Sequence, residues 1–597
     1  MASEAIVELP APAATPATEP ATEPAAQPGA VAAGLGVLAV ATLAGCGGGG
    51  SSTAAPPVVA PPAVVLPAIT ITGVTIREAG GAPLTVNGQP GATLVINLPD
   101  AGPDAAEQVL TIQVRPVAPA ARALSGGPTL LTILINPDPA DTAAAFAAKA
   151  ATTRATLAVL GFPPGWDELG GHLQLSATQI ITRALARMSS TPSESYPGWI
   201  DGRIKSWREF SLLSDADQKI YQDNKYWRRQ ELKAWWFRQM VTSSDTLTER
   251  LLLFWHNLYT TSGSGVEDPE LIARQHRLYR QSLNGNLKTF LYAMSRDPAM
   301  CQYLDSARNK KAAPNENFAR ELMELFTLGE RTRFGGYAET DVPDLAKFFT
   351  GYLLNDNNEF TFTLAEHETA AKTLFGQTRL ANPAAPDSYA KDGDWAIDRI
   401  LEKADGGGHS YAARYLVTRL WREFLGEPIG SDATRIQVIA DKLSGAFAWD
   451  LKKLYAEFFA SPAFTDTARR GTRLRAPVEL FAGFYRPLGL YPDNWLDITW
   501  RCGGLDQDLL DPPNVFGWPG GAAWINLKAV VDRRSYVSGL QWQDALKNLP
   551  VRLHGVIRLL LLAIDPVDPP LKSTDWQINY INTRVGHLLT DPVYNLG

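Results

Sequence analysis

The residues best suited to chemistry in this 597-residue chain gather between positions 315 and 324. On a helix, side chains three and four positions apart share one face, so Arg320, Glu321 and Glu324 would lie together there. If that face is buried, its carboxylates need a charged partner or a metal ion. A histidine from elsewhere in the chain could complete such a site, either for a divalent cation or as part of a general acid/base pair. The candidate catalytic residues are His256, Glu316, Arg320, Glu321 and His367.

The same residues also fit an ordinary structural role. Arg320 and Glu324 stand four positions apart, which is the spacing of a common helix salt bridge. His256 follows Phe254 and Trp255 and would fit a histidine packed in the core. Structural networks of ion pairs resemble active sites, so both interpretations stay open. The motifs HExxH, GxSxG and the P-loop do not occur, which removes the main support for the zinc proteases, α/β-hydrolases and nucleotide triphosphatases that carry them.

Tryptophan-rich loops suggest a second kind of site. The chain contains 16 Trp, and Trp518 and Trp524 flank a turn rich in Gly and Pro. Exposed indoles on rigid loops stack on sugar rings or on hydrophobic polymers. In a large helical domain, however, Trp more often belongs to the core. The candidate ligand-binding residues are Asn257, Asn315, Trp518 and Trp524.

Length, charge and cysteine content bound the class of protein. The chain exceeds one ordinary domain, since domains usually span about 100–200 residues. A formal net charge of −7 and a pI near 5.7 argue against a nucleic-acid partner, which normally binds a basic domain. The cysteines Cys46, Cys301 and Cys502 lack the spacing of a zinc site. We interpret Cys301 and Cys502 as buried free thiols rather than as a disulfide.

The amino-terminal stretch indicates export. Residues 1–30 are rich in Ala, Pro, Thr and Glu and predict a disordered tail. The apolar segment 31–46 is too short to span a bilayer but suits a signal peptide. It ends in Leu-Ala-Gly-Cys, which resembles a bacterial lipobox with Cys46 as the lipidated residue. Residues 47–67 then form a Gly/Ser/Pro linker.

One feature disagrees with a signal peptide, because the stretch before the apolar segment is acidic and signal peptides begin with basic residues. Either the true start lies downstream or the segment is not cleaved, and the plain alternative is a low-complexity tail with an incidental cysteine. We predict an exported protein that a lipid anchor holds in the cell envelope, at the outer membrane or in the periplasm.

Two kinds of periodicity divide the rest of the chain. Residues 68–137 predict a small β-sandwich-like module, because short apolar runs alternate with Gly and Pro turns at 69–76, 84–86, 94–96, 110–114 and 130–135. Residues 145–597 predict a large multi-helix domain, so the fold class is mainly α. In that domain, Thr246 and Glu249 have the spacing of a capping box. Asn315 predicts the start of a helix with Phe318, Leu322 and Leu325 as its apolar stripe and Gly329 as its end.

Four longer motifs lie in the helical domain. They read Phe-Trp-His-Asn at 254–257, Arg-Asp-Pro-Ala-Met at 296–300, Pro-Asn-Glu-Asn-Phe-Ala-Arg-Glu-Leu-Met-Glu-Leu-Phe-Thr-Leu-Gly at 314–329, and Pro-Pro-Asn-Val-Phe-Gly-Trp-Pro-Gly-Gly at 512–521. In type and order they resemble the bacterial domain-of-unknown-function family 1800, over roughly residues 145–597. A further segment departs from the family's His-Asp-x-Gly-x-Lys pattern, because Glu368 and Ala370 stand between His367 and Lys372. A longer acid at that position would weaken a tight site built on the aspartate.

The resemblance implies an exported protein without an established reaction, often encoded beside a second exported protein of phosphatase- or sulfatase-like fold. Two functions are then in question. The first is a binding or assembly role at the cell surface, with a polysaccharide or a second exported protein as partner. The alternative is a metal-assisted or acid/base hydrolase acting on an envelope or extracellular substrate. Convergence of the five candidate catalytic residues beside an open cleft would favour the hydrolase, and their dispersal would favour binding.

Overall fold

The structure, a computed structural model, describes residues 74–76, 94–97, 110–112, 133–136, 143–525, 527–549, 560–562, 585–586 and 588–596. Strand β1 (Val74–Ile76) pairs antiparallel with β3 (Leu110–Ile112), and β2 (Leu94–Asn97) pairs in parallel with β4 (Ile133–Asn136). These strands overlap four of the five predicted strand segments. The fifth, 84–86, lies outside the described residues, as do the tail, the lipobox with Cys46 and the linker. The sandwich-like packing stays a prediction.

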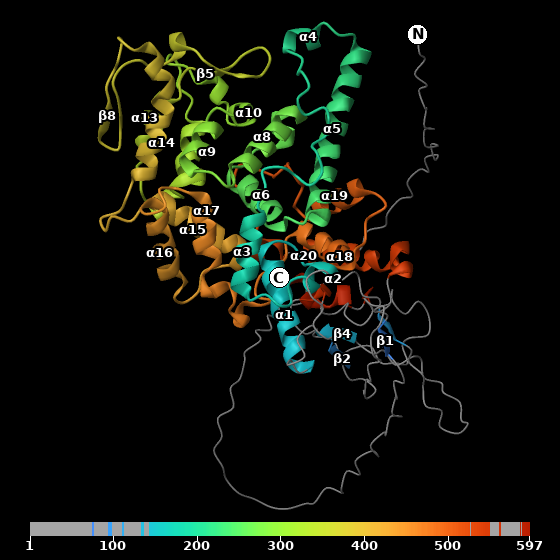
Figure 1. Ribbon diagram of the computed structural model, residues 1–597. Helices are drawn as coiled ribbons and strands as arrows, with labels where there is room; N and C mark the ends of the chain where they lie inside the picture. The colour runs from blue at the N-terminus through green and yellow to red at the C-terminus, as the bar shows by residue number, and fades with distance from the viewer. Residues whose placement is uncertain are drawn as a thin grey trace, which may run out of the picture. The chain divides into compact units, whose positions relative to one another are not determined.

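The described residues from 143 onward are mainly helical, which confirms the predicted fold class (Figure 1). The first half of the domain contains α1 (Ala143–Leu160), α2 (Trp166–Gly170), α3 (Ala177–Arg187), α4 (Trp207–Ser211), α5 (Asp215–Thr242), α6 (Thr246–Leu258), α7 (Gly263–Val266), α8 (Pro269–Ser282), α9 (Leu287–Met294), α10 (Pro298–Tyr303), α11 (Asn317–Glu321), α12 (Arg331–Phe334) and α13 (Asp341–Phe348). The second half contains α14 (Asp392–Glu402), α15 (Tyr411–Leu425), α16 (Asp432–Ser444), α17 (Leu451–Phe459), α18 (Pro477–Leu488), α19 (Trp495–Gly504) and α20 (Leu527–Gly539). Between α13 and α14 lie two hairpins, β5 (Tyr352–Leu354) with β6 (Phe360–Phe362) and β7 (Lys372–Leu374) with β8 (Gln377–Arg379).

Helix α6 lies at the centre of this packing, in contact with α5, α8 and α15 (Figure 1). Every residue of α6 is buried except Asn257, which is partly exposed. The capping box predicted between Thr246 and Glu249 is wrong. The side chain of Asp245 caps the helix instead, accepting a backbone N–H of the first turn at 3.1 Å. Glu249 is unavailable for capping because its carboxylate pairs with Arg280 of α8 at 2.7 Å in the core.

The segment after Asn315 forms the predicted helix with two differences. Asn315 Oδ1 accepts the backbone N–H of Asn317 at 2.9 Å, so the chain first makes a turn and α11 begins at Asn317. From Leu322 to Thr327 the helix then has π geometry, a rare form that is frequent at functional sites. The predicted apolar stripe is buried, and Gly329 ends the helix with a φ of 84°.

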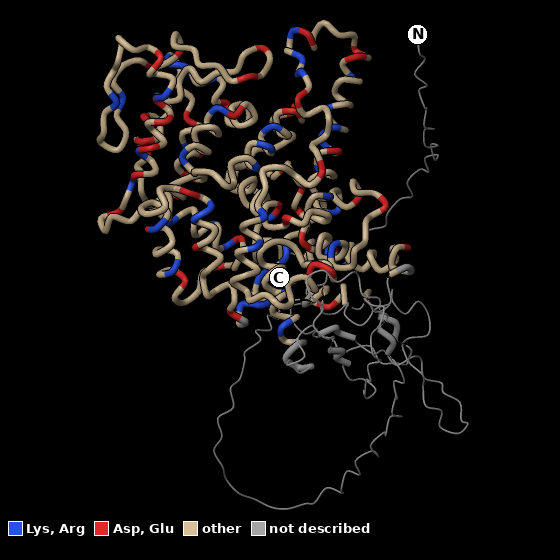
Figure 2. The backbone as a smooth tube through the Cα atoms, viewed as in Figure 1, with Lys and Arg blue, Asp and Glu red and all other residues tan. Residues whose placement is uncertain are grey.

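Three properties bear on the class of protein. Cys301 and Cys502 are buried free thiols, which agrees with their interpretation from the sequence. Within the described ranges, no helix has the length and apolar character that crossing a membrane requires. Figure 2 shows acidic and basic residues interspersed along the helices and loops. An excess of positive or of negative charge therefore occurs only locally, at particular sites.

Candidate functional site

The loop 514–521 is tied to the end of α6. The side-chain oxygen Oδ1 of Asn257 accepts the backbone N–H of Trp518 at 2.6 Å, across 261 positions of sequence. Gly517 has a φ of 90°, and a Cβ atom on it would lie 2.2 Å from that same oxygen. Only glycine fits this conformation and this approach. Two motifs that are far apart in the chain, at 254–257 and 512–521, therefore build one site.

Behind this loop, His256 is enclosed by aromatic rings. It is 1% exposed, and neither ring nitrogen has a hydrogen-bond partner among the described residues. Trp518 meets it edge to face at a centroid distance of 5.2 Å, and Trp236 and Tyr279 pack on other sides. Burial lowers the pKa of His256 to about 3, so the imidazole is neutral at ordinary pH. The geometry is that of a core histidine, and its catalytic role stays a prediction.

The loop borders an acidic cavity of about 470 Å³. Among the residues that line it are Asp506, Asp508, Asp511, Asn514, Phe516 and Trp518. Lys233 of α5 lies beside two of these acids, with Nζ 2.6 Å from Asp508 Oδ1 and 3.9 Å from Asp511 Oδ2. Asp511 also accepts hydrogen bonds from the backbone N–H and the hydroxyl of Ser264, at 3.0 and 2.8 Å, and from the hydroxyl of Ser262.

The two aspartates beside Lys233 differ in acidity. Burial raises the pKa of Asp508 despite the neighbouring lysine. Burial acts on Asp511 in the same direction, but the hydrogen bonds from Ser262 and Ser264 outweigh it and lower the pKa of Asp511. A pair of carboxyl groups whose pKa values are pushed apart is the usual arrangement for general acid and base. Neither aspartate was predicted from the sequence, where the only signal was the position of Asp511 directly before the motif at 512–521.

The loop also borders a basic cleft of about 680 Å³, and Trp518 and Pro519 line both spaces. Helix α6 contributes Arg250, Leu253, Phe254 and Asn257 to its wall, and α15 contributes Arg419, Arg422 and Glu423. The loop and the residues directly after it contribute 518–525. Arg473 also lines the cleft. Trp518 and Trp524 form part of the wall although they are only 5% and 6% exposed, so both indoles belong mainly to the core, and their ligand-binding role stays a prediction.

The cleft contains more positive than negative charge. Most of its arginines are paired, since Arg250 binds Glu423 at 2.8 Å, Arg422 binds Glu427 at 3.0 Å, and Arg473 binds Glu479 at 2.7 Å. Arg419 differs from them. Its guanidinium donates to the hydroxyl of Tyr415 at 2.8 Å and has no carboxylate partner among the described residues. This arginine is therefore free to meet an anionic group that enters the cleft.

The predicted catalytic residues on α11 lie at the surface in an ion-pair network. Arg320 binds Glu339 at 2.6 Å and Glu316 at 3.3 Å, and all three side chains are at least a third exposed. Glu321 is half-buried, and its carboxylate has no hydrogen-bond partner in the described part of the chain. Burial and the neighbouring Glu324 raise the pKa of Glu321 to about 7. A carboxyl group of this acidity suits proton transfer near neutral pH.

His367 belongs to a separate buried network. Its Nδ1 lies 2.5 Å from the carbonyl oxygen of Thr350, and its Nε2 lies 3.2 Å from Lys372 Nζ and 3.3 Å from Asp392 Oδ2. Lys372 and Asp392 form a buried ion pair at 2.7 Å. Glu368, where the resemblance leads us to expect an aspartate, accepts the backbone N–H of Ala370 at 2.9 Å. Arg379 of β8 also binds Asp392, at 3.0 Å, so the network holds the β7–β8 hairpin against the start of α14.

These residues therefore occupy three places. No hydrogen bond or ion pair between described residues connects His256, the group at 316–321 and His367. Asn257 borders the cleft, whereas Asn315 only shapes the turn before α11. In the described ranges, no group of three or more His, Cys, Asp or Glu side chains is placed to hold a metal ion.

Fold and site together define a large, mainly α-helical domain with a glycine-rich loop between an acidic cavity and a basic cleft. Residues 142–589 match the family described as "Protein of unknown function (DUF1800)", and the chain belongs to that family. This match confirms the resemblance inferred from the motifs. The comparisons with curated proteins and with solved structures found no match.

Proposed function

We propose that the helical domain is a binding protein whose basic cleft takes a segment of an acidic polysaccharide. The observation that carries the proposal is Arg419, a cation without a carboxylate partner among the described residues, in a cleft of about 680 Å³. Ligand sites commonly measure roughly 300–1,000 Å³, so the cleft has room for a few sugar rings. Guanidinium groups recognise carboxylates and sulfates by paired hydrogen bonds.

The position of the cleft suits a polymer better than a small molecule. Ile525, which lines the cleft, is 60% exposed. Exposed apolar side chains beside a cleft extend the surface along which a chain of sugar rings can lie. Binding of this kind also agrees with the dispersal of the predicted catalytic residues.

A direct test compares two arginine variants. Arg419→Gln removes the unpaired charge, and Arg331→Gln removes an exposed arginine on α12 as a matched control. Calorimetric titration with polygalacturonate should show binding that weakens at least tenfold in Arg419→Gln, with little change in the control. A neutral glucan should bind weakly to all three proteins. The proposal fails if the wild type binds no acidic polysaccharide, or if both variants lose affinity equally.

Export and lipid anchoring form a second part of the proposal, supported by the segment 31–46 and its terminal cysteine. A lipid on Cys46 would hold the domain in the cell envelope, where an acidic polysaccharide or a second exported protein is within reach. Metabolic labelling with a fatty-acid analogue should mark the wild type, and Cys46→Ser should abolish the label and release the protein into the soluble fraction. Labelling of both proteins, or of neither, would contradict the anchor.

The acidic cavity favours a second candidate function, acid/base hydrolysis. Asp508, with its raised pKa, would donate a proton to a leaving group, and Asp511, with its lowered pKa, would activate water. Incubation with polysaccharides should then release reducing ends, and Asp508→Asn or Asp511→Asn should each reduce the rate at least a hundredfold. Asp506 lines the same cavity but does not belong to the pair beside Lys233, so Asp506→Asn serves as the control. No release by the wild type would exclude hydrolysis of the substrates tried.

A further inference from the structure

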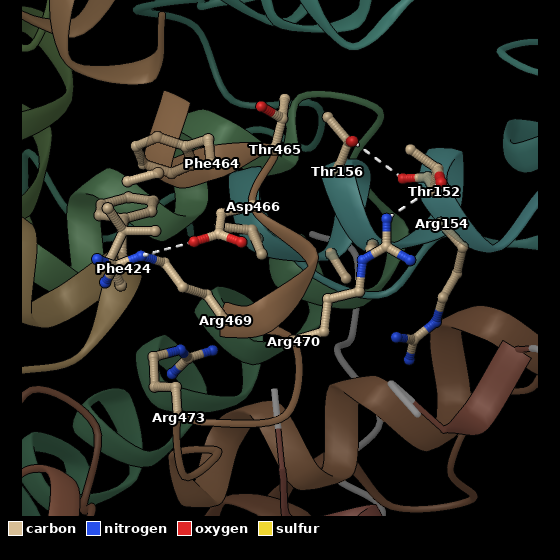
Figure 3. Close-up of a pocket in the computed structure, with 15 residues that line it drawn as sticks. Thr152, Arg154, Thr156, Phe424, Phe464, Thr465, Asp466, Arg469, Arg470 and Arg473 are labelled. Carbon is tan, nitrogen blue, oxygen red and sulfur yellow. Dashed lines mark hydrogen bonds and ion pairs between the residues drawn. The ribbon is translucent and has the colours of Figure 1, made fainter. Parts of the chain in front are cut away.

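A small cavity of about 40 Å³ lies between α1, α15 and the segment 462–473 (Figure 3). Its described lining contains four arginines and one carboxylate, that of Asp466. A cavity needs roughly 10–15 Å³ to hold one water molecule, so this one has room for an ion with several oxygen atoms. It is separate from the loop that carries the proposed polysaccharide site, although Arg473 lines both.

Two of the four arginines are neutralised. Arg469 binds both carboxylate oxygens of Asp432, at 2.6 and 2.8 Å, and its Nε lies 3.9 Å from Asp466. Arg473 binds both carboxylate oxygens of Glu479, at 2.7 and 2.8 Å. These pairs need no further anion.

The other two arginines have no carboxylate partner among the described residues. Arg470 reaches toward α1 and donates to the hydroxyl of Thr152 at 3.1 Å, as Figure 3 shows. Arg154 is 2% exposed; it donates to the carbonyl oxygen of Leu560 at 3.4 Å, while its Nε has no hydrogen-bond partner in the described part of the chain. Burying a guanidinium without a counter-charge, as at Arg154, is strongly unfavourable.

A third cation increases this cost. Arg475 lies near Arg154, is also 2% exposed, and donates to the carbonyl oxygen of Leu561 at 3.1 Å, with its Nη1 unpartnered among the described residues. Burial, and then repulsion from Arg475 and Arg470, lower the pKa of Arg154 to about 9. Burial also lowers the pKa of Arg475 and of Arg470. An anion in the cavity would relieve Arg154 and Arg470, which line it, because it supplies a counter-charge and accepts N–H groups from both.

We propose that this cavity is a binding site for a tetrahedral oxyanion, inorganic phosphate or sulfate, held by Arg154 and Arg470 with the hydroxyl of Thr152. The ion connects the first helix of the domain to the segment after α17, so its binding stabilises the fold. The small volume excludes a sugar ring, and the site is therefore distinct in ligand from the basic cleft.

Calorimetry and thermal unfolding of the full chain, with phosphate and with sulfate, test the proposal. Both anions should bind with saturable heat and raise Tm, whereas chloride at equal ionic strength should not. Arg470→Gln, at a partly exposed position, should weaken binding at least tenfold, and Arg331→Gln should not change it. Circular dichroism verifies that each variant is folded.

The outcomes separate this site from the polysaccharide site. Arg419→Gln should keep full affinity for phosphate and sulfate, and Arg470→Gln should keep its affinity for polygalacturonate. Absence of saturable binding in the folded wild type would overturn the proposal and leave the polysaccharide site unaffected. Undiminished binding in Arg470→Gln would place the ion elsewhere and would also overturn it.

Discussion

Replacing Gly517 by alanine should displace the loop that separates the acidic cavity from the basic cleft. Its φ of 90° is a left-handed conformation that costs an L-residue about 1–2 kcal/mol. The new methyl group would also lie 2.2 Å from Asn257 Oδ1, the atom that accepts the Trp518 N–H. The loop must then move, and losing this hydrogen bond with its acceptor left unsatisfied adds about 1–3 kcal/mol. We expect a total destabilisation of about 2–5 kcal/mol.

Two neighbouring glycines provide matched controls. Gly521 has a φ of 53° but no atom within 4 Å of a new Cβ, so Gly521→Ala should cost only the conformational part, about 1–2 kcal/mol. Gly520 has an ordinary φ of −141° and open space, so Gly520→Ala should be nearly neutral. Urea denaturation followed by tryptophan fluorescence measures all three. If Gly517→Ala is no more destabilising than Gly521→Ala, the contact between loop and α6 does not have the importance we assign to it.

Three further predictions concern buried ionisable side chains. Burial alone would raise the pKa of Glu479, but Arg250 and Arg473 lower it to about 2, below its ordinary value of 4.5. The stability that the ionised Glu479 contributes is therefore complete above pH 4.5 and is lost as the pH falls toward 2. Glu479→Gln should remove this acid transition from the denaturation curves. The substitution should also lower the free energy of unfolding by about 3–5 kcal/mol at neutral pH. His256, with a folded pKa of about 3 against an ordinary 6.5, stays neutral in the fold while the unfolded chain binds a proton, so stability should fall from pH 6.5 toward pH 3. His256→Phe should reduce that pH dependence with neutral-pH stability unchanged or higher, and a large destabilisation would contradict the core assignment. Asp392→Asn leaves Lys372 buried without its counter-charge and should cost about 3–5 kcal/mol in the same assay, whereas an effect below about 1 kcal/mol would argue against a buried ion pair.

The fold could largely be predicted because local patterns agree with it. The apolar stripe of Phe318, Leu322 and Leu325 is buried, and Gly329 ends the helix as its position suggested. The π geometry from Leu322 onward was not predictable, because periodicity alone does not distinguish it from an α-helix at this length. The capping box failed because Glu249 meets Arg280, a partner that only the packing of α6 on α8 brings near.

The candidate site was predicted only in part. Asn257 and Trp518 were chosen separately, one from a helix motif and one from a tryptophan loop, and the sequence offered no reason to join them. Asp508 and Lys233 were not chosen at all, since their pairing at 2.6 Å crosses 275 positions of sequence. Secondary-structure patterns carry no information about such contacts.

The sequence by itself determined the family, the mainly helical class and the free state of the two described cysteines. Each of these properties follows from residue types and from their order over short stretches of the chain. Only the tertiary structure decided which polar residues share a site. It placed His256 in an aromatic core, His367 in a buried ion-pair network and Arg320 at the surface, although all three looked equally suited to chemistry. The physical reason is that acidity and reactivity depend on burial and on the nearest charges, and both are set by contacts between distant parts of the chain.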